Sequence, residues 1–273
     1  MPIIDTADKT RLYVKDWGTG RPVVLIHGWP LNADSWEYQA VRLAEAGYRV
    51  VSYDRRGFGR SDQPFTGYDY DTMADDLAAV ISTLGLTDAV IAGFSMGGGE
   101  VSRYMSRHDG KNVSQAMLIS SIAPFMLKTD DNPNGVPSDV FAEMKDGLRS
   151  DRQAFLQDFF KGFYGQDTKA GGVSEAALHW TWQMAMPASP KATLDCVDAF
   201  AQTDLRPDMA AFKVPTLVVH GDADQVVPYE TSGKKAAEMI ADARLKTYEG
   251  APHGLTATHA DQLCEDMLDF LKS

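Results

Sequence analysis

The 273-residue sequence has few cysteines, a shortage of positive charge and no long apolar run. Its two cysteines, Cys196 and Cys264, lie far apart and form no C-x-x-C pair, so we expect neither a disulfide framework nor a zinc site. Lys and Arg number 26 against 38 Asp and Glu, which gives a formal net charge of -12. Because nucleic-acid affinity depends mainly on basic side chains that neutralise phosphates, this balance disfavours a nucleic-acid partner, and we expect none.

The sequence also lacks segments that would direct the chain to a membrane. No stretch approaches the ~18 apolar residues of a membrane-spanning helix, and residues 1–9 carry no basic segment followed by an apolar one. We therefore expect a cytoplasmic protein with no membrane partner. The remaining composition, 44% hydrophobic and 23% charged, is that of a globular protein long enough for one α/β domain with an insert.

The most informative stretch is the apolar run 89–92, which leads into Gly93-Phe94-Ser95-Met96-Gly97. A Gly-x-Ser-x-Gly pattern between a buried strand and a helix is typical of a nucleophile elbow, where the serine occupies a strained turn and the glycines allow close packing. The start of the following helix offers free N–H groups that can hold an oxyanion. A lone match can also be a loop without chemistry, but here both the strand and the helix are recognisable.

Strands and helices alternate through most of the chain, as hydrophobic patterns of period 2 and 3.6 indicate. The expected strands are 12–17, 23–26, 48–53, 89–92, 114–120, 215–220 and 243–248, and the expected helices include 33–46, 70–84, 100–108 and 229–240. This order predicts a parallel sheet with helices on both faces. The charged turn 54–61 follows a strand, and we interpret its charges as structural pairing.

The alternation is lost between residues 123 and 208. We therefore divide the chain into a body made of 1–122 and 209–273 and a helical cap insert of 123–208. The insert contains many aromatic and Met residues at helical spacing, most of which we expect to pack it onto the body.

A minority of these aromatic residues should line a substrate pocket. We expect this of Phe125 because it closely follows a strand end, and of Phe159 and Phe163 because residues i and i+4 share a helix face. The full set of expected pocket residues is Trp29, Phe125, Phe141, Phe159, Phe163 and Val227.

Three loops that follow strands carry, in chain order, Ser95, the pair Asp222 and Asp224, and His253. This is the Ser, Asp, His order of the α/β-hydrolases. Serine needs a base within hydrogen-bond reach, and the imidazole of that base needs a carboxylate that fixes its tautomer. From the residues alone, Asp222 and Asp224 are nearly equivalent candidates for the carboxylate.

Two other histidines compete with His253 for the role of base. His27 lies in the loop after strand 23–26, and His220 still belongs to a strand. His253 instead lies in a loop bounded by Gly and Pro after the last strand, where it can reach a neighbouring loop. We therefore predict that His253 is the base.

The chain resembles the cofactor-free haloperoxidase and aryl esterase branch of the α/β-hydrolase superfamily, also called perhydrolases, over essentially its full length. The matching segments are His27-Gly28-Trp29-Pro30, 54–61, 93–98, 221–228 and Ala251-Pro252-His253-Gly254. The resemblance implies an α/β-hydrolase fold with a mostly parallel eight-stranded sheet, helices on both faces and an inserted helical cap.

The resemblance also assigns roles within the site. It implies that Asp224, three residues before Val227-Pro228, is the acid, and that the backbone N–H groups of Trp29 and Met96 form the oxyanion hole. It implies that no cofactor and no metal take part. It further implies a homo-oligomer, either a trimer or a hexamer built as a dimer of trimers.

The predicted function is that of a serine carboxylesterase or aryl esterase that hydrolyses small esters through an acyl-enzyme. We expect perhydrolase (haloperoxidase) side activity, because hydrogen peroxide competes with water for the acyl group. Two alternatives stay open: a lactamase with the same triad, and a ligand receptor without turnover built on a hydrolase body.

Overall fold

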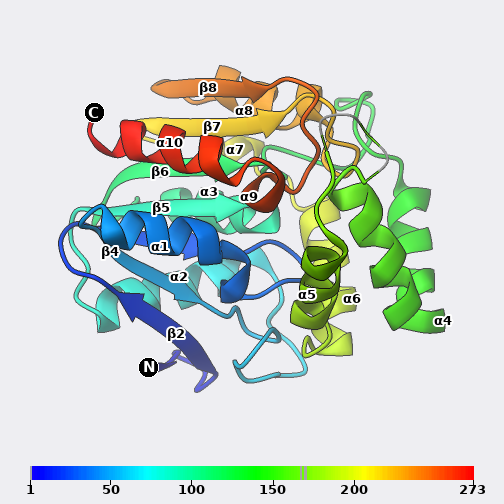
Figure 1. Ribbon diagram of the computed structural model, residues 1–273, viewed down its shortest axis with the longest axis horizontal. Helices are drawn as coiled ribbons and strands as arrows, with labels where there is room; N and C mark the ends of the chain where they lie inside the picture. Colours follow the sequence, from blue (N-terminus) through cyan, green and yellow to red (C-terminus); the bar gives the residue numbers. More distant parts are fainter. Residues whose placement is uncertain (1, 167, 169–170) are drawn as a thin grey trace.

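A mixed eight-stranded sheet runs through the computed structural model, which describes residues 2–166, 168 and 171–273 (Figure 1). Its strands are β1 (Ile3–Asp5), β2 (Arg11–Trp17), β3 (Pro22–Ile26), β4 (Arg49–Tyr53), β5 (Ala89–Phe94), β6 (Val113–Ile119), β7 (Thr216–Gly221) and β8 (Ala243–Tyr248). They follow the order β1-β2-β4-β3-β5-β6-β7-β8. Strand β2 is antiparallel to both of its neighbours, and all other pairs are parallel. The expected eight-stranded, mostly parallel sheet is confirmed.

Helices cover both faces of this sheet, which explains why its central strands are apolar throughout. Every residue of β3 and of β5 is buried, as expected for strands of a parallel sheet with two covered faces. One face carries α1 (Glu37–Glu45) and α10 (Ala260–Leu271), and the other carries α2 (Tyr70–Thr83), α3 (Met96–Arg107) and α8 (Gly233–Met239) (Figure 1). Shorter elements are η1 (Ala33–Trp36), η2 (Tyr229–Thr231) and α9 (Leu255–Thr258).

The connection from β6 to β7 is helical and lies beside the carboxyl ends of the parallel strands (Figure 1). Its helices are α4 (Ser138–Phe163), α5 (Glu175–Ala185), α6 (Pro190–Gln202) and α7 (Arg206–Met209). Helix α4 is kinked at Asp151, whose φ of -152° and ψ of 88° are not helical and whose carboxylate caps the second part by accepting from Ala154 N. The described residues of 123–208 add no strand to the sheet. The domain boundaries themselves stay a prediction.

Two local differences from the sequence pattern have simple causes. Strand β1 was not expected, because it is three residues long and only its central residue, Ile4, is buried. The helix expected over 229–240 is interrupted at Ser232, whose φ of -119° and ψ of -95° separate η2 from α8. Within the described part of the chain, no helix combines the length and apolar character needed to cross a bilayer.

Candidate active site

Ser95 lies in the sharp turn between β5 and α3, with a φ of 55° and a ψ of -119°. Residues other than glycine rarely adopt these backbone angles, and such a conformation costs about 1–3 kcal/mol. The turn exists because its flanking glycines have no Cβ. A Cβ on Gly93 would lie 2.3 Å from the Gly97 carbonyl oxygen, and one on Gly97 would lie 2.5 Å from the carbonyl oxygen of Ile26. The Gly-x-Ser-x-Gly pattern is therefore a steric requirement of this turn.

Ser95, His253 and Asp224 come from three loops at the carboxyl edge of the sheet, and their side chains form one hydrogen-bonded chain. Ser95 Oγ lies 2.9 Å from His253 Nε2, and His253 Nδ1 lies 2.6 Å from Asp224 Oδ2. A carboxylate at Nδ1 keeps the proton on that nitrogen, so Nε2 is left to accept the proton of the serine hydroxyl. The three residues are only 6%, 1% and 6% exposed, respectively.

Both oxygens of the Asp224 carboxylate accept hydrogen bonds, which fixes its orientation. Its Oδ1 accepts the backbone N–H groups of Val226 and Val227, each at 2.8 Å. Burial alone would raise the pKa of Asp224. The electrostatic attraction of His253 and the hydrogen bonds from His220 and His253 outweigh this effect, so the pKa of Asp224 lies well below its usual range. Asp224 is therefore ionised at neutral pH.

The two competing histidines are both engaged elsewhere. His27 Nε2 accepts the backbone N–H of Arg55 at 2.9 Å, so its Nδ1 carries the proton and donates to the Gly28 carbonyl at 2.8 Å. Burial and the nearby Arg55 lower the pKa of His27 well below its usual value. His220 Nε2 lies 3.0 Å from the Val227 carbonyl oxygen. Among the histidines that the structure describes, His253 is the one hydrogen-bonded to Ser95.

Two backbone N–H groups are available beside Ser95. Met96 is the first residue of α3, and neither its N–H nor that of Trp29 donates a hydrogen bond within the described residues. The loop that carries Trp29 packs closely on the elbow, because a Cβ on Gly28 would lie 3.0 Å from Ser95 Cβ. The Trp29 indole anchors this loop by donating from Nε1 to the Thr193 carbonyl at 3.0 Å.

A small, mostly apolar cavity of about 50 Å³ opens at Ser95 and His253. Five of the six expected pocket residues line it, namely Trp29, Phe141, Phe159, Phe163 and Val227. The remaining lining residues are Ser95, Met96, Ile122, Met126, Val136, Val140, Met144, Phe200, Val226 and His253. An outer groove of about 510 Å³ shares Val140, Met144, Phe159, Phe163 and Val226 with this cavity and adds Phe155, Asp158, Lys161, Gly162 and Gln225.

Phe125 does not line the cavity, and the expectation that it does is wrong. Its ring packs under the guanidinium of Arg206, with the guanidinium carbon 4.9 Å from the ring centroid. The next side chain, Met126, faces the cavity instead. The sequence offers no period that orients this irregular segment, whereas Met144 follows Phe141 by one helical turn and was within reach of the same argument.

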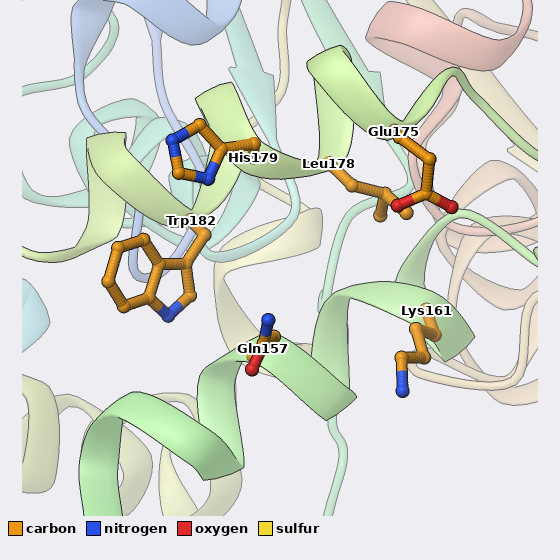
Figure 2. Close-up of a pocket in the computed structure, with 6 residues that line it drawn as sticks. All are labelled: Gln157, Lys161, Glu175, Leu178, His179 and Trp182. Atoms are coloured by element: carbon orange, nitrogen blue, oxygen red, sulfur yellow. The ribbon is translucent and has the colours of Figure 1, made fainter.

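A second hollow, of about 390 Å³, lies between α4 and α5, and most of the residues that line it are polar or charged (Figure 2). It is lined by Gln157, Lys161, Glu175, Leu178, His179 and Trp182, and none of the Ser95, Asp224 or His253 side chains reaches it. His179 stacks on Trp182, with ring centroids 6.0 Å apart. Across residues 2–166, 168 and 171–273, no group of three or more His, Cys, Asp or Glu side chains is arranged to hold a metal ion.

A buried ion pair joins the loop after β4 to helix α3, the helix that begins next to Ser95. Arg55 and Glu100 are fully buried, and Arg55 Nε donates to Glu100 Oε2 at 2.7 Å. The same guanidinium donates from Nη2 to the His27 carbonyl at 2.8 Å, so it connects the loop after β3 to helix α3. The structural pairing expected for turn 54–61 is confirmed here and at Arg60, which pairs with Asp54.

Asp222 connects two loops. Its Oδ1 accepts the backbone N–H of Gly250 at 2.6 Å, which joins the loop after β7 to the loop after β8. The bond tethers the loop that carries His253, and Asp222 itself makes no contact with the imidazole among the described hydrogen bonds.

Comparisons with known proteins find relatives over the whole length of the chain. A family model described as the alpha/beta hydrolase fold matches residues 21–260. A non-heme chloroperoxidase of Kitasatospora aureofaciens is 45% identical over 273 residues, 99% of this chain and 99% of its own. A bifunctional esterase/perhydrolase of Acinetobacter calcoaceticus is 43% identical over 277 residues, 100% of both chains. The crystal structure of a bromoperoxidase from Bacillus anthracis has a TM-score of 0.95 at 45% identity, covering 100% of this chain and 99% of that one.

The Arg55–Glu100 pair generates a stability prediction. Arg55→Met leaves the buried Glu100 carboxylate without a countercharge, with only the Tyr53 hydroxyl still donating to it, so the free energy of unfolding in urea should fall by about 3–5 kcal/mol. In the double variant Arg55→Met/Glu100→Gln no charge stays buried and the amide oxygen still accepts from the Tyr53 hydroxyl, so most of this loss should be recovered. A double variant as unstable as the single one would show that the uncompensated charge is not the cause.

The two aspartates are predicted to differ sharply in kinetics. Asp224→Asn should lower kcat by about 10⁴-fold, because an amide at this position favours the wrong imidazole tautomer. Asp222→Asn keeps an oxygen that accepts the Gly250 N–H and should lower kcat less than about tenfold. Steady-state hydrolysis of p-nitrophenyl acetate by both purified variants measures the difference, and the reverse ranking would contradict the choice of Asp224.

Proposed function

The chain belongs to the α/β-hydrolase family of enzymes, and we propose that it is a serine carboxylesterase acting on small esters, including aryl esters. The observation that carries the proposal is the hydrogen-bonded chain from Ser95 through His253 to Asp224, with separations of 2.9 and 2.6 Å, at the base of an apolar cavity. Relatives named as an esterase/perhydrolase and as non-heme chloroperoxidases support both hydrolysis and perhydrolysis.

In the acylation half of the proposed reaction, Ser95 Oγ attacks the ester carbonyl carbon while His253 Nε2 takes the hydroxyl proton. The negative charge that develops on the carbonyl oxygen is held by the backbone N–H groups of Trp29 and Met96. Each such donor is worth roughly 3–4 kcal/mol of barrier in serine hydrolases. His253 then returns the proton to the leaving alcohol oxygen as the C–O bond breaks, which leaves the acyl-enzyme.

In the second half, His253 takes a proton from water, and the resulting attack on the acyl carbon releases the carboxylic acid and restores the Ser95 hydroxyl. Hydrogen peroxide can take the place of water in this step. Attack by a peroxide oxygen on the same carbon releases a peracid and restores the same hydroxyl. Halogenation would then follow outside the site, because a peracid that diffuses away oxidises halide in solution.

The dimensions of the site favour small acyl groups. The inner cavity at Ser95, of about 50 Å³, is small and has mainly apolar walls, so it suits a short acyl chain. The outer groove of about 510 Å³ is ten times as large, and its aromatic walls suit an apolar or aryl alcohol portion. The lining contributes few polar atoms, so a neutral ester fits better than a charged one.

Ser95→Ala is the primary test of the proposal. The wild type should hydrolyse p-nitrophenyl acetate with many turnovers, and in the presence of hydrogen peroxide it should form peracetic acid. Ser95→Ala should abolish both activities, with the free energy of unfolding unchanged within about 0.5 kcal/mol, because one hydroxyl is removed without a cavity in the core. A few slow turnovers by the wild type would favour a receptor, and faster turnover of lactams would favour a lactamase.

Acyl-chain selectivity should depend on Phe141, which lines the inner cavity only. Phe141→Leu enlarges that cavity, and we expect it to raise the ratio of kcat/KM for p-nitrophenyl hexanoate over acetate by about tenfold. Phe155→Leu is the matched control, because Phe155 lines the outer groove only and its loss should leave this ratio unchanged. An equal change in both variants would exclude the inner cavity as the site of acyl selection.

We also propose that the protein is a homo-oligomer, either a trimer or a hexamer, as its resemblance to the perhydrolases implies. Static light scattering at micromolar concentration should give three or six times the mass of one chain. A mass equal to one chain would contradict this proposal without affecting the chemistry at Ser95.

A further inference from the structure

A second buried histidine, His220, also contacts the carboxylate of Asp224. It lies near the end of β7 and is fully buried. Its Nε2 is 3.0 Å from the Val227 carbonyl oxygen and 3.2 Å from Asp224 Oδ2, the same oxygen that binds His253 Nδ1 at 2.6 Å. Both neighbours of Nε2 are acceptors, so this nitrogen carries a proton and acts as a donor.

The opposite edge of the His220 ring faces packed backbone. Within the described residues, Nδ1 has no hydrogen-bond partner. The backbone at Gly233 packs directly against it, since a Cβ there would lie 2.4 Å from Nδ1. The polar contacts of His220 are therefore made through Nε2, on the side of the Asp224 loop.

Few other titratable groups face His220 from the elements around it. Asp224 and His253 lie on one side, in the loops after β7 and β8. The Tyr229 ring, from η2, lies 5.9 Å away between centroids, and its hydroxyl is engaged with Thr247 Oγ1 at 2.8 Å. The N–H of His220 therefore acts on the carboxylate and on the Val227 carbonyl.

We infer that His220 is a positioning residue for the proposed ester hydrolysis, and this inference rests on the proposed function. By donating to Val227, it holds the loop whose N–H groups bind Asp224 Oδ1. By lying against Oδ2, it turns that oxygen toward His253 and withdraws part of its negative charge. The carboxylate then has a single orientation, so the imidazole stays aligned with Ser95 through both halves of the reaction.

The test compares three variants in which the donor is kept, misplaced or removed. The side-chain amide of His220→Gln places an N–H near the position of Nε2, that of His220→Asn is too short to reach Asp224, and His220→Leu has no donor. We expect His220→Leu and His220→Asn to lower kcat for p-nitrophenyl acetate about 10- to 100-fold with KM little changed, and His220→Gln to keep most of kcat. Active-site titration of the acyl-enzyme burst corrects each kcat for misfolded protein.

Two further measurements separate positioning from a purely structural role. The acidic limb of the kcat/KM profile should move to higher pH in His220→Leu, because a carboxylate with one donor fewer stabilises the imidazolium of His253 more strongly. In an Asp224→Asn background, His220→Leu should cause almost no further loss, since its effect passes through the carboxylate. If Leu does not fold at this position, the comparison of Asn with Gln takes its place.

The outcomes distinguish this inference from the function on which it rests. A wild type without Ser95-dependent turnover removes both. A wild type that turns over normally, with His220→Leu and His220→Asn unchanged in kcat per active site and in pH profile, overturns the role of His220 alone. Equal losses from His220→Leu in the presence and absence of the Asp224 carboxylate would likewise overturn it, because the effect would then not pass through Asp224.

Discussion

Close packing of the backbone around Ser95 is the constraint on which the rest of the site depends. Three glycines, Gly28, Gly93 and Gly97, bring the loop after β3, strand β5 and the start of α3 so near to one another that no side chain fits between them. This contact allows Ser95 to adopt a positive φ and places the loop of Trp29 against the serine. Strain at one residue is thus maintained by packing around it, as expected for a site whose geometry is set in advance.

The parts of this arrangement that the sequence predicts are those with a local cause. The elbow is recognisable because its steric requirement falls within five consecutive residues, and the strands because each has its own hydrophobic period. Asp222 and Asp224 share one turn, so their separate contacts with Gly250 and His253 depend on a loop 28 and 29 residues away. No local pattern separates them, and only the resemblance favoured Asp224. The same limit explains Phe125 and Met126, which lie in a segment without regular period.

The charges near the site are divided between a fixed interior set and an apolar cavity. The interior set is Arg55 and Glu100, which neutralise each other without solvent contact. The cavity at Ser95 presents mainly carbon atoms, and the imidazole of His253 lies between this cavity and the ionised Asp224. A buried pair of this kind contributes little net stability but penalises any arrangement that separates its members. The pair therefore keeps the loop after β3 and helix α3 in a fixed position relative to each other.

The Ser95–His253–Asp224 chain and most of the cavity wall come from different parts of the sequence. Ser95, Asp224 and His253 come from loops of the sheet, whereas Phe141, Met144 and Phe159 of the cavity wall all belong to α4. Phe163 also belongs to α4, but it differs from these residues because its ring packs directly against His253, with ring centroids 4.8 Å apart. Mutation can accordingly remodel most of the cavity wall without moving Ser95, Asp224 or His253. A lineage with this architecture can diversify in the esters it accepts while its chemistry is inherited unchanged.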